Sequence, residues 1–149
     1  MGKINEIHEV EIIYKRPALT KMEKISCSKD LSYVFRKLIN SEKVDLKEFF
    51  LVALLSRSNN VLGVSNVSTG TTNGTTVNLK EILQLAIKTN SSSIAICHNH
   101  PSGNLSVSEA DIKITAKIKE ACKICEICLL DHIILTSESY YSMADEFEI

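Results

Sequence analysis

The apolar residues of this chain form two kinds of pattern, short unbroken runs and a helical repeat. Runs of strand length lie at residues 48–56, 93–97 and 129–135. Apolar runs this short, with polar turns around them, are typical of strands buried on both faces. At residues 29–40 the apolar side chains instead recur at i, i+3, i+4, i+7 and i+8. That spacing predicts an amphipathic helix, which Ser26 or Ser28 can cap.

Weaker patterns place further elements between these. Residues 9–16 alternate in part and predict a strand, and residues 61–68 follow a polar turn, which indicates a hairpin with the strand before it. Capping boxes begin at Asn78 and Ser106 and predict helices that reach to about residues 88 and 123. The expected inner faces of these helices consist of Leu79, Ile82, Leu83 and Ala86, and of Ile112, Thr115, Ile118 and Cys122.

The order of the elements predicts one α/β domain over residues 1–149, in which helices flank a mixed β-sheet. A short strand is expected at residues 140–142, and residues 1–8 are expected to form a flexible arm. The segment TGTTNGTT at residues 69–76 lacks the Lys-Ser/Thr pair of a phosphate-binding loop. We therefore expect a polar loop of the kind that often flanks a site.

Residues that could bind a metal or take part in catalysis follow the run at 93–97. They lie in the sequence CHNHPSG at residues 97–103 and in SEAD at residues 108–111. Residues i and i+2 of a strand share a face, so His98 and His100 can point together from the strand's end. Asp111 is expected just past the first turn of the helix that Ser106 caps, where it can face back toward the strand. Two neutral imidazoles and one carboxylate suit a zinc ion with a fourth position open for water, as a hydrolase needs.

Two other kinds of metal enzyme share parts of this string. The letters of His98-Asn99-His100 spell HNH, but in the nucleases of that name these residues are spread over a ββα unit. A zinc deaminase needs H-x-E and then P-C-x-x-C. Here His100 stands in place of the Glu, and no proline precedes Cys122-x-x-Cys125. Both interpretations are therefore disfavoured.

Two features downstream have a structural and a functional interpretation. Cys122, Cys125 and Cys128 have a C-x-x-C-x-x-C spacing that could hold zinc or an iron–sulfur cluster. A fourth ligand is missing nearby, and cysteine often acts as a small buried hydrophobe, so we expect structural cysteines. Asp131-His132 lies inside an apolar run. His132 is either a satisfied core histidine or a group that supports a metal ligand from behind, and both stay open.

Composition excludes several classes of function. The net charge of −1 gives the chain no overall field that attracts nucleic acid or an anionic membrane. No segment approaches the ~18 apolar residues of a membrane span, and the N-terminus lacks the apolar run of a signal peptide. The five cysteines are an odd number in a chain without a secretion signal. This favours a cytoplasmic protein with reduced thiols.

The string His98-x-His100-Pro101, followed by Ser108-x-x-Asp111, resembles the metal motif of the JAMM (MPN/JAB) metalloprotease superfamily. The longer HNHPSG pattern, with LDH at residues 130–132 and YYS at residues 140–142, resembles the RadC-like branch of that superfamily. The resemblance extends from about Leu31 to the C-terminus. It implies a JAMM/MPN-like fold with the layering of cytidine deaminases.

The resemblance also implies roles for particular residues. It implies one zinc ion on His98, His100 and Asp111, with Glu48 acting on the water at the metal. Glu81 competes for the role of Glu48, but its place in a capping box already explains it. Ser108 matches the serine that would donate to the oxyanion of the tetrahedral intermediate.

We therefore expect a zinc-dependent hydrolase that cleaves a peptide or isopeptide bond in a protein or peptide substrate. The alternative is a non-catalytic binding module of the same fold, with a role in DNA processing or mobile elements, and a metal-dependent nuclease is a third possibility. RadC-like proteins are associated by name with DNA repair. A longer form of the family carries a helix-hairpin-helix module that this sequence lacks, which weakens that expectation. The sequence carries no signal for an oligomeric state.

Overall fold

A mixed sheet of five strands lies at the centre of the computed structural model, which describes residues 7–70 and 76–149. The strand order is β2-β1-β3-β4-β5. β3 and β4 pair in parallel, and the other neighbouring strands pair antiparallel. The strands are β1 (Glu48–Leu55), β2 (Val61–Gly70), β3 (Ser93–Asn99), β4 (Cys128–Leu135) and β5 (Tyr140–Ser142). The predicted mixed α/β sheet, including the β1–β2 hairpin, is confirmed.

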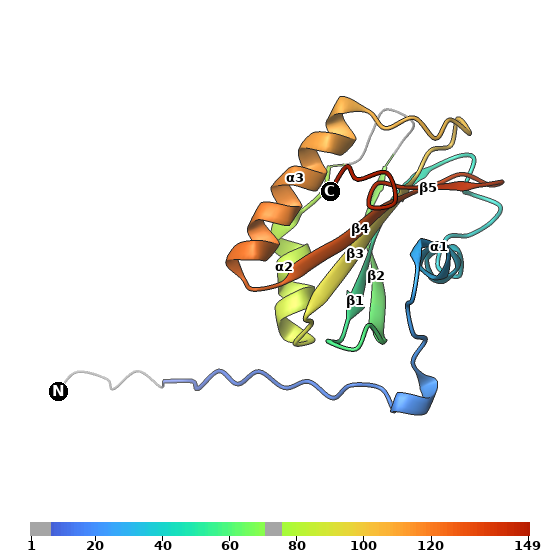
Figure 1. Ribbon diagram of the computed structural model, residues 1–149. Helices are drawn as coiled ribbons and strands as arrows, with labels where there is room; N and C mark the ends of the chain where they lie inside the picture. Colours follow the sequence, from blue (N-terminus) through green and yellow to red (C-terminus); the bar gives the residue numbers. More distant parts are fainter. Residues whose placement is uncertain (1–6, 71–75) are drawn as a thin grey trace.

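Helices cover both faces of the sheet (Figure 1). α1 (Ser28–Arg36) packs on one face, while α2 (Leu79–Lys88) and α3 (Glu109–Ile124) pack on the other. A 3₁₀ turn at Leu19–Lys21 precedes α1. Because α3 connects the parallel strands β3 and β4, it crosses over the face of the sheet, and its first turn lies close to the end of β3.

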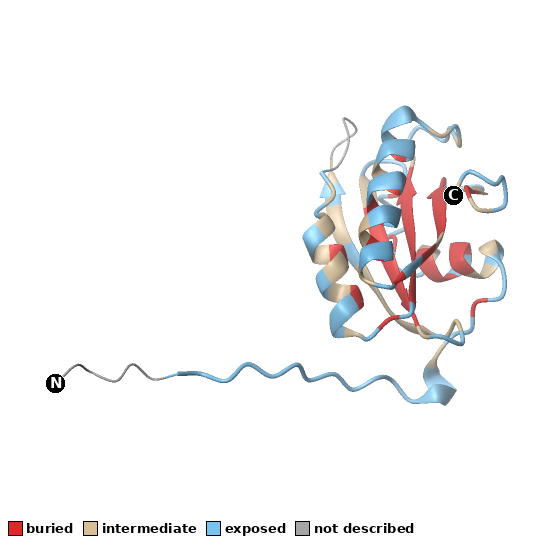
Figure 2. Cartoon of the chain, turned by 60° about the vertical axis from the view of Figure 1, so that its left-hand side comes forward, coloured by how far each residue is buried: buried red, intermediate tan, exposed pale blue. Residues whose placement is uncertain are grey.

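β1 separates two apolar cores. Its residues Phe50, Val52 and Leu54 pack toward α2 and α3, and Leu51, Ala53 and Leu55 pack toward α1. This alternation explains why the β1 run is apolar at nearly every position. Figure 2 shows the buried residues concentrated in the central strands. β2 lies at the sheet edge, and most of its residues are only half-buried. Residues 71–75 of the expected polar loop fall outside the described residues.

The strand expected at residues 9–16 is wrong. This stretch is extended but pairs with no strand in the described part of the chain, and Figure 1 shows it leading away from the sheet. Val10 is 90% exposed and Ile12 is 77% exposed. The alternating pattern is real, but a strand forms only where a partner accepts its backbone hydrogen bonds. Of the expected arm at residues 1–8, residues 1–6 lie outside the described residues, and residues 7 and 8 are exposed.

The start of α3 differs from the expectation. Its N-cap is Ser108 rather than Ser106, and the capping box pairs Ser108 with Asp111. Asp111 is therefore the third residue of the helix and lies inside the first turn. Thr115, Ile118 and Cys122 are buried as expected. Ile112, expected on the inner face, is 51% exposed, because Asp111 takes that position.

The other two helix starts differ less. Cys27 rather than Ser26 or Ser28 is the N-cap of α1, and the Asp30 carboxylate accepts hydrogen bonds from the backbone of residues 26 and 27. α1 ends at Arg36, earlier than the repeat indicated. The Asn78 side chain accepts a hydrogen bond from the Glu81 amide, as expected. Within the described segments, no helix is both long and apolar enough to cross a membrane.

Candidate metal centre

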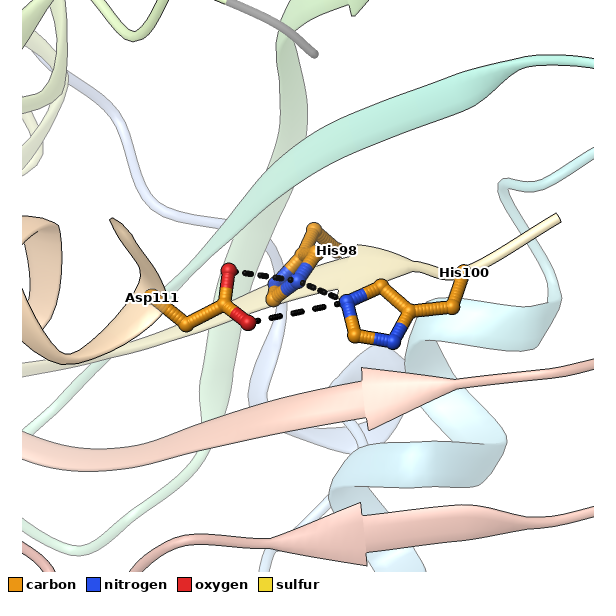
Figure 3. A group of neighbouring side chains, drawn as sticks. All are labelled: His98, His100 and Asp111. Carbon is orange, nitrogen blue, oxygen red and sulfur yellow. Dashed lines mark hydrogen bonds and ion pairs between the residues drawn. The ribbon is translucent and has the colours of Figure 1, made fainter. Parts of the chain in front are cut away.

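Three ionisable side chains from two elements meet beside the end of β3 (Figure 3). The Nε2 atoms of His98 and His100 are 2.8 Å apart. One Asp111 carboxylate oxygen lies 3.1 Å from Nε2 of His98, and the other lies 3.6 Å from Nε2 of His100. The strand places both imidazoles on one face, and the first turn of α3 brings the carboxylate to them. The sequence-predicted trio is thus a single cluster.

A backbone carbonyl orients the ring of His100. Its Nδ1 lies 2.5 Å from the carbonyl oxygen of Asn104, in the loop that joins β3 to α3. A carbonyl oxygen only accepts hydrogen bonds, so Nδ1 carries a proton. Nε2 is therefore the atom that either donates a proton to Asp111 or, once deprotonated, offers its lone pair to a metal. Gly103 allows the chain to turn back so that Asn104 lies against His100, since the φ of Gly103, +80°, lies in the left-handed region that favours glycine.

The cap of α3 orients Asp111. One carboxylate oxygen accepts a hydrogen bond from the Ser108 amide at 2.8 Å, and the Ser108 hydroxyl accepts one from the Asp111 amide at 3.1 Å. Burial opposes ionisation of this carboxyl, but hydrogen bonds from His100 and His98 hold its pKa well below the usual range. The hydrogen bond to Asp111 in turn raises the pKa of His100. The carboxyl is therefore ionised at neutral pH.

These donors fit a divalent cation. Two imidazole Nε2 atoms and a carboxylate oxygen, all within 4.8 Å of one another, converge on one point. The set is nitrogen-rich with one hard oxygen, which suits Zn²⁺ better than Mg²⁺ or Ca²⁺. In the described residues no other group of three His, Cys, Asp or Glu side chains comes this close together.

Glu48 reaches the same face from the start of β1. Phe50 pairs with His98 across the antiparallel β1–β3 ladder, and residues 48 and 50 share a face of the strand. A cavity of about 330 Å³ is lined by Glu48 together with His98, His100, Ser108 and Asp111. Glu81 lines neither this cavity nor the neighbouring one that Glu48 and His100 also border. The structure therefore brings Glu48, and not Glu81, to the cluster.

Asn99 fixes the position of Glu48, a role that sequence reasoning missed. Its side chain is fully buried, and its oxygen accepts a hydrogen bond from the Phe49 amide at 2.7 Å. Its amide nitrogen donates to the backbone oxygens of Val44 and Lys47, each at 2.7 Å. The residue between the two histidines thus ties the start of β1 to the end of β3. The available sequence signal was strand alternation: between two histidines that share one face, the side chain of Asn99 points to the opposite face.

His132 and Thr115 also belong to this centre, although the sequence left the first open and gave the second only a packing role. Nε2 of His132 lies 2.7 Å from Nδ1 of His98, and Nδ1 of His132 lies 2.5 Å from the Thr115 hydroxyl. Burial and the neighbouring His98 lower the pKa of His132 well below its ordinary value. His132 is therefore a neutral imidazole behind the cluster.

The three cysteines between α3 and β4 differ in burial. Cys122 is buried, Cys125 is half-buried and Cys128 is exposed, so the expectation of structural burial holds fully for Cys122 alone. Burial raises the pKa of the Cys122 thiol to about 11, which keeps it protonated and unsuited to binding a metal.

Replacing Cys122 with serine is expected to lower the free energy of unfolding by about 1–3 kcal/mol, because a hydroxyl would enter an apolar core. The metal content should not change. Thermal unfolding and elemental analysis measure the two effects, and Cys128→Ser, at an exposed position, is the matched control. Loss of one metal equivalent in either variant would show that the cysteines form a second site.

The comparisons with known proteins agree on one family. A family model described as "RadC-like JAB domain" matches residues 25–148. A protein of Flavobacterium johnsoniae named "UPF0758 protein" is 38% identical over 128 residues, which cover 86% of this chain and 55% of that protein. Proteins of the same name from Alkaliphilus metalliredigens and Clostridium tetani are 36% and 42% identical, over 98% and 82% of this chain. The chain matches 63% and 52% of the length of those two relatives.

Proposed function

The chain belongs to the RadC-like JAB domain family, and on that premise we propose that it is a zinc-dependent hydrolase of peptide or isopeptide bonds. The observation that carries the proposal is the convergence of His98, His100 and Asp111 on one point, with Glu48 and Ser108 on the wall of the same cavity. A strand end, a helix cap and a second strand supply these groups independently. Such a set has the parts of a hydrolytic zinc site: three ligands, a carboxylate base and a hydroxyl donor.

His98, His100 and Asp111 would hold the metal. Zinc bound there supplies a Lewis acid for a substrate carbonyl and lowers the pKa of a coordinated water toward about 7. The Nδ1 atoms of both histidines are engaged in hydrogen bonds, so both rings offer Nε2. The charge of such a site, two neutral imidazoles and one carboxylate around a divalent cation, stays positive and favours attack by water on a carbonyl.

Glu48 moves the proton. The attacking water forms a carbon–oxygen bond and loses a proton, which the Glu48 carboxylate accepts. The amide carbon–nitrogen bond then breaks, and Glu48 returns the proton to the departing amine. The half-buried position of Glu48 at the wall of the cavity, held through Asn99, allows both transfers from one place.

Ser108 stabilises the oxyanion. Its hydroxyl oxygen accepts a hydrogen bond from the Asp111 amide, so its own proton can be donated to the substrate. The side chain is exposed at the cavity wall, on the same helix cap as Asp111. A donor aimed at the oxygen that becomes negative lowers the barrier without any movement of the protein.

The cavities beside the cluster suit an extended chain as substrate. The 330 Å³ cavity has apolar walls at Phe50, Val77 and Ile114. A second cavity of about 490 Å³ also borders Glu48 and His100, and its walls include Asp45, Ser102 and Ser106. The two cavities share Glu48 and His100. A polypeptide that passes through both would place an amide bond beside the base.

Incubation of the zinc-loaded protein with a library of proteome-derived peptides, in water enriched in ¹⁸O, tests this function. We expect new peptide ends, each with one ¹⁸O atom in the new carboxylate, detected by mass spectrometry. Chelation should abolish the cleavage, and added zinc should restore it. A protein that binds zinc but produces no new ends would be a binding module instead of a hydrolase.

A further inference from the structure

His132 lies directly behind the candidate metal centre. It is fully buried in β4, the strand that pairs in parallel with β3. The centroid of its ring lies 4.8 Å from that of His98, and the ring of Phe50 lies against both imidazoles. Nothing in the chemistry of the proposed hydrolase uses this histidine. Its position nevertheless determines what His98 can do.

Only one assignment of donors and acceptors around His132 allows His98 to bind a metal through Nε2. For Nε2 of His98 to offer a lone pair, its Nδ1 must carry the proton, and this Nδ1 lies 2.7 Å from Nε2 of His132. His132 must then be protonated at Nδ1, where it donates to the Thr115 hydroxyl oxygen. The Thr115 hydroxyl in turn donates to the backbone oxygen of Asp111 at 2.6 Å. With this assignment every group in the chain has a partner.

We propose that His132 is a positioning residue for the metal: its Nε2 accepts a hydrogen bond from the Nδ1–H of His98 and so fixes the Nε2 lone pair of His98 toward Asp111 and His100. The inference rests on the proposed function, since it presupposes a metal at the cluster. The chain of hydrogen bonds begins at one ligand and ends at the backbone of another. It therefore also fixes the distance between the β3 ligand and the α3 ligand.

A histidine in this position has a different effect from the carboxylate that often lies behind a metal-bound imidazole. A carboxylate would add a negative charge and make the ligand more electron-donating. A buried neutral imidazole orients His98 without that charge. The metal keeps more of its positive charge, which makes it a stronger Lewis acid.

The test compares zinc affinity, measured by competition with a chromogenic chelator at fixed pH, in three variants of the full chain. His132→Leu conserves size but removes the acceptor, and we expect affinity to fall by about 10–100-fold, as for loss of such a partner in other zinc proteins. His132→Gln keeps an acceptor oxygen near the position of Nε2 and should recover part of the loss. Thr115→Val removes the hydroxyl that fixes the ring of His132, and a smaller loss is expected.

Asp131→Asn is the matched control. Asp131 is the preceding residue on the same strand and is also buried, but its carboxylate accepts from Ser142 and from the Ala144 amide, away from the cluster. This substitution should affect stability and leave zinc affinity unchanged. A second readout is ¹⁵N NMR of the zinc-loaded protein, where the Nδ1 proton of His98 should be protected from exchange in the wild type and exposed in His132→Leu.

The outcomes separate the two proposals. A wild-type protein that binds no zinc overturns both the metal site and the role of His132. Wild-type zinc affinity in folded His132→Leu overturns the positioning role alone. Should His132→Leu fail to fold, Thr115→Val decides, because unchanged affinity and an unchanged Nδ1 signal of His98 there would overturn the role.

Discussion

Replacing Glu48 with glutamine should leave the fold and the zinc content unchanged and lower the turnover of a cleaved peptide by roughly 10²–10⁴, the usual contribution of a general base. Glutamine keeps the size and hydrogen-bonding capacity of the side chain but cannot accept a proton. The loss corresponds to about 3–5 kcal/mol of transition-state stabilisation. Because Glu48 does not belong to the cluster of three ligands, elemental analysis should still find the metal.

Glu81→Gln is the control for this experiment. Glu81 lies in the first turn of α2, where its amide donates to Asn78, and it borders neither cavity beside the cluster. We expect turnover close to that of the wild type and a change in stability of only a few tenths of a kcal/mol. Abolished turnover in Glu81→Gln with full turnover in Glu48→Gln would show that the base has been placed on the wrong strand.

Replacing Asp111 with asparagine should weaken zinc binding by more than the ~10–100-fold that loss of a supporting partner costs. The variant removes the only negative charge among the three candidate ligands. The asparagine oxygen can still accept a hydrogen bond from the Ser108 amide, so the cap of α3 should survive. Chelator competition measures the affinity, and circular dichroism checks that the helix content is unchanged.

The chain contains a closely matched control for that variant. Asp30 occupies the same third position in the capping box of α1, where its carboxylate accepts hydrogen bonds from the Ser26 and Cys27 amides. Asp30→Asn makes the same chemical change in the same local setting, but outside the cluster. It should preserve the cap of α1 to the same extent, because the asparagine oxygen can still accept from the Ser26 and Cys27 amides, and it should leave zinc affinity untouched. Equal losses of affinity in both variants would mean that Asp111 acts only through helix stability.

Local patterns were sufficient to predict most of the elements and the membership of the cluster. The runs that became β1, β3 and β4 are apolar on both faces because helices pack against each side of the sheet. The i, i+2 spacing of His98 and His100 placed both imidazoles on one face before any contact was known. The predictions of the strands and of the shared face of the two histidines needed only the geometry of a single strand, which can be inferred from the local sequence.

The phase of α3 shows where local patterns are ambiguous. The sequence predicted a capping box that begins at Ser106, whereas the structure has its N-cap two residues later, at Ser108. The buried face of the helix consists of Asp111, Thr115, Ile118 and Cys122, which follow one another at intervals of three or four residues. Ile112 is also three residues before Thr115, so spacing alone did not exclude it from this face. Asp111 is a polar residue at the start of an otherwise mostly apolar face, so the hydrophobic pattern did not include it, although it is a candidate metal ligand.

Local patterns alone could not predict contacts between strands, and the expectation that Glu48 acts at the metal came from the family resemblance. The approach of Glu48 to the cluster depends on the register that pairs Phe50 with His98. The contact between His132 and His98 depends on the parallel pairing of β4 with β3. Both registers are set by the packing of the whole sheet and not by residues near the site.

Anomalous scattering at the zinc edge, from crystals of the zinc-loaded protein, would show whether His98, His100 and Asp111 bind the metal. We expect one strong peak per chain, at bonding distances of about 2.0–2.2 Å from Nε2 of His98, Nε2 of His100 and a carboxylate oxygen of Asp111. The peak should be absent from crystals of the His98→Ala, His100→Ala double variant. Zinc located elsewhere, or retained at full occupancy in the double variant, would show that these three residues are not the metal ligands.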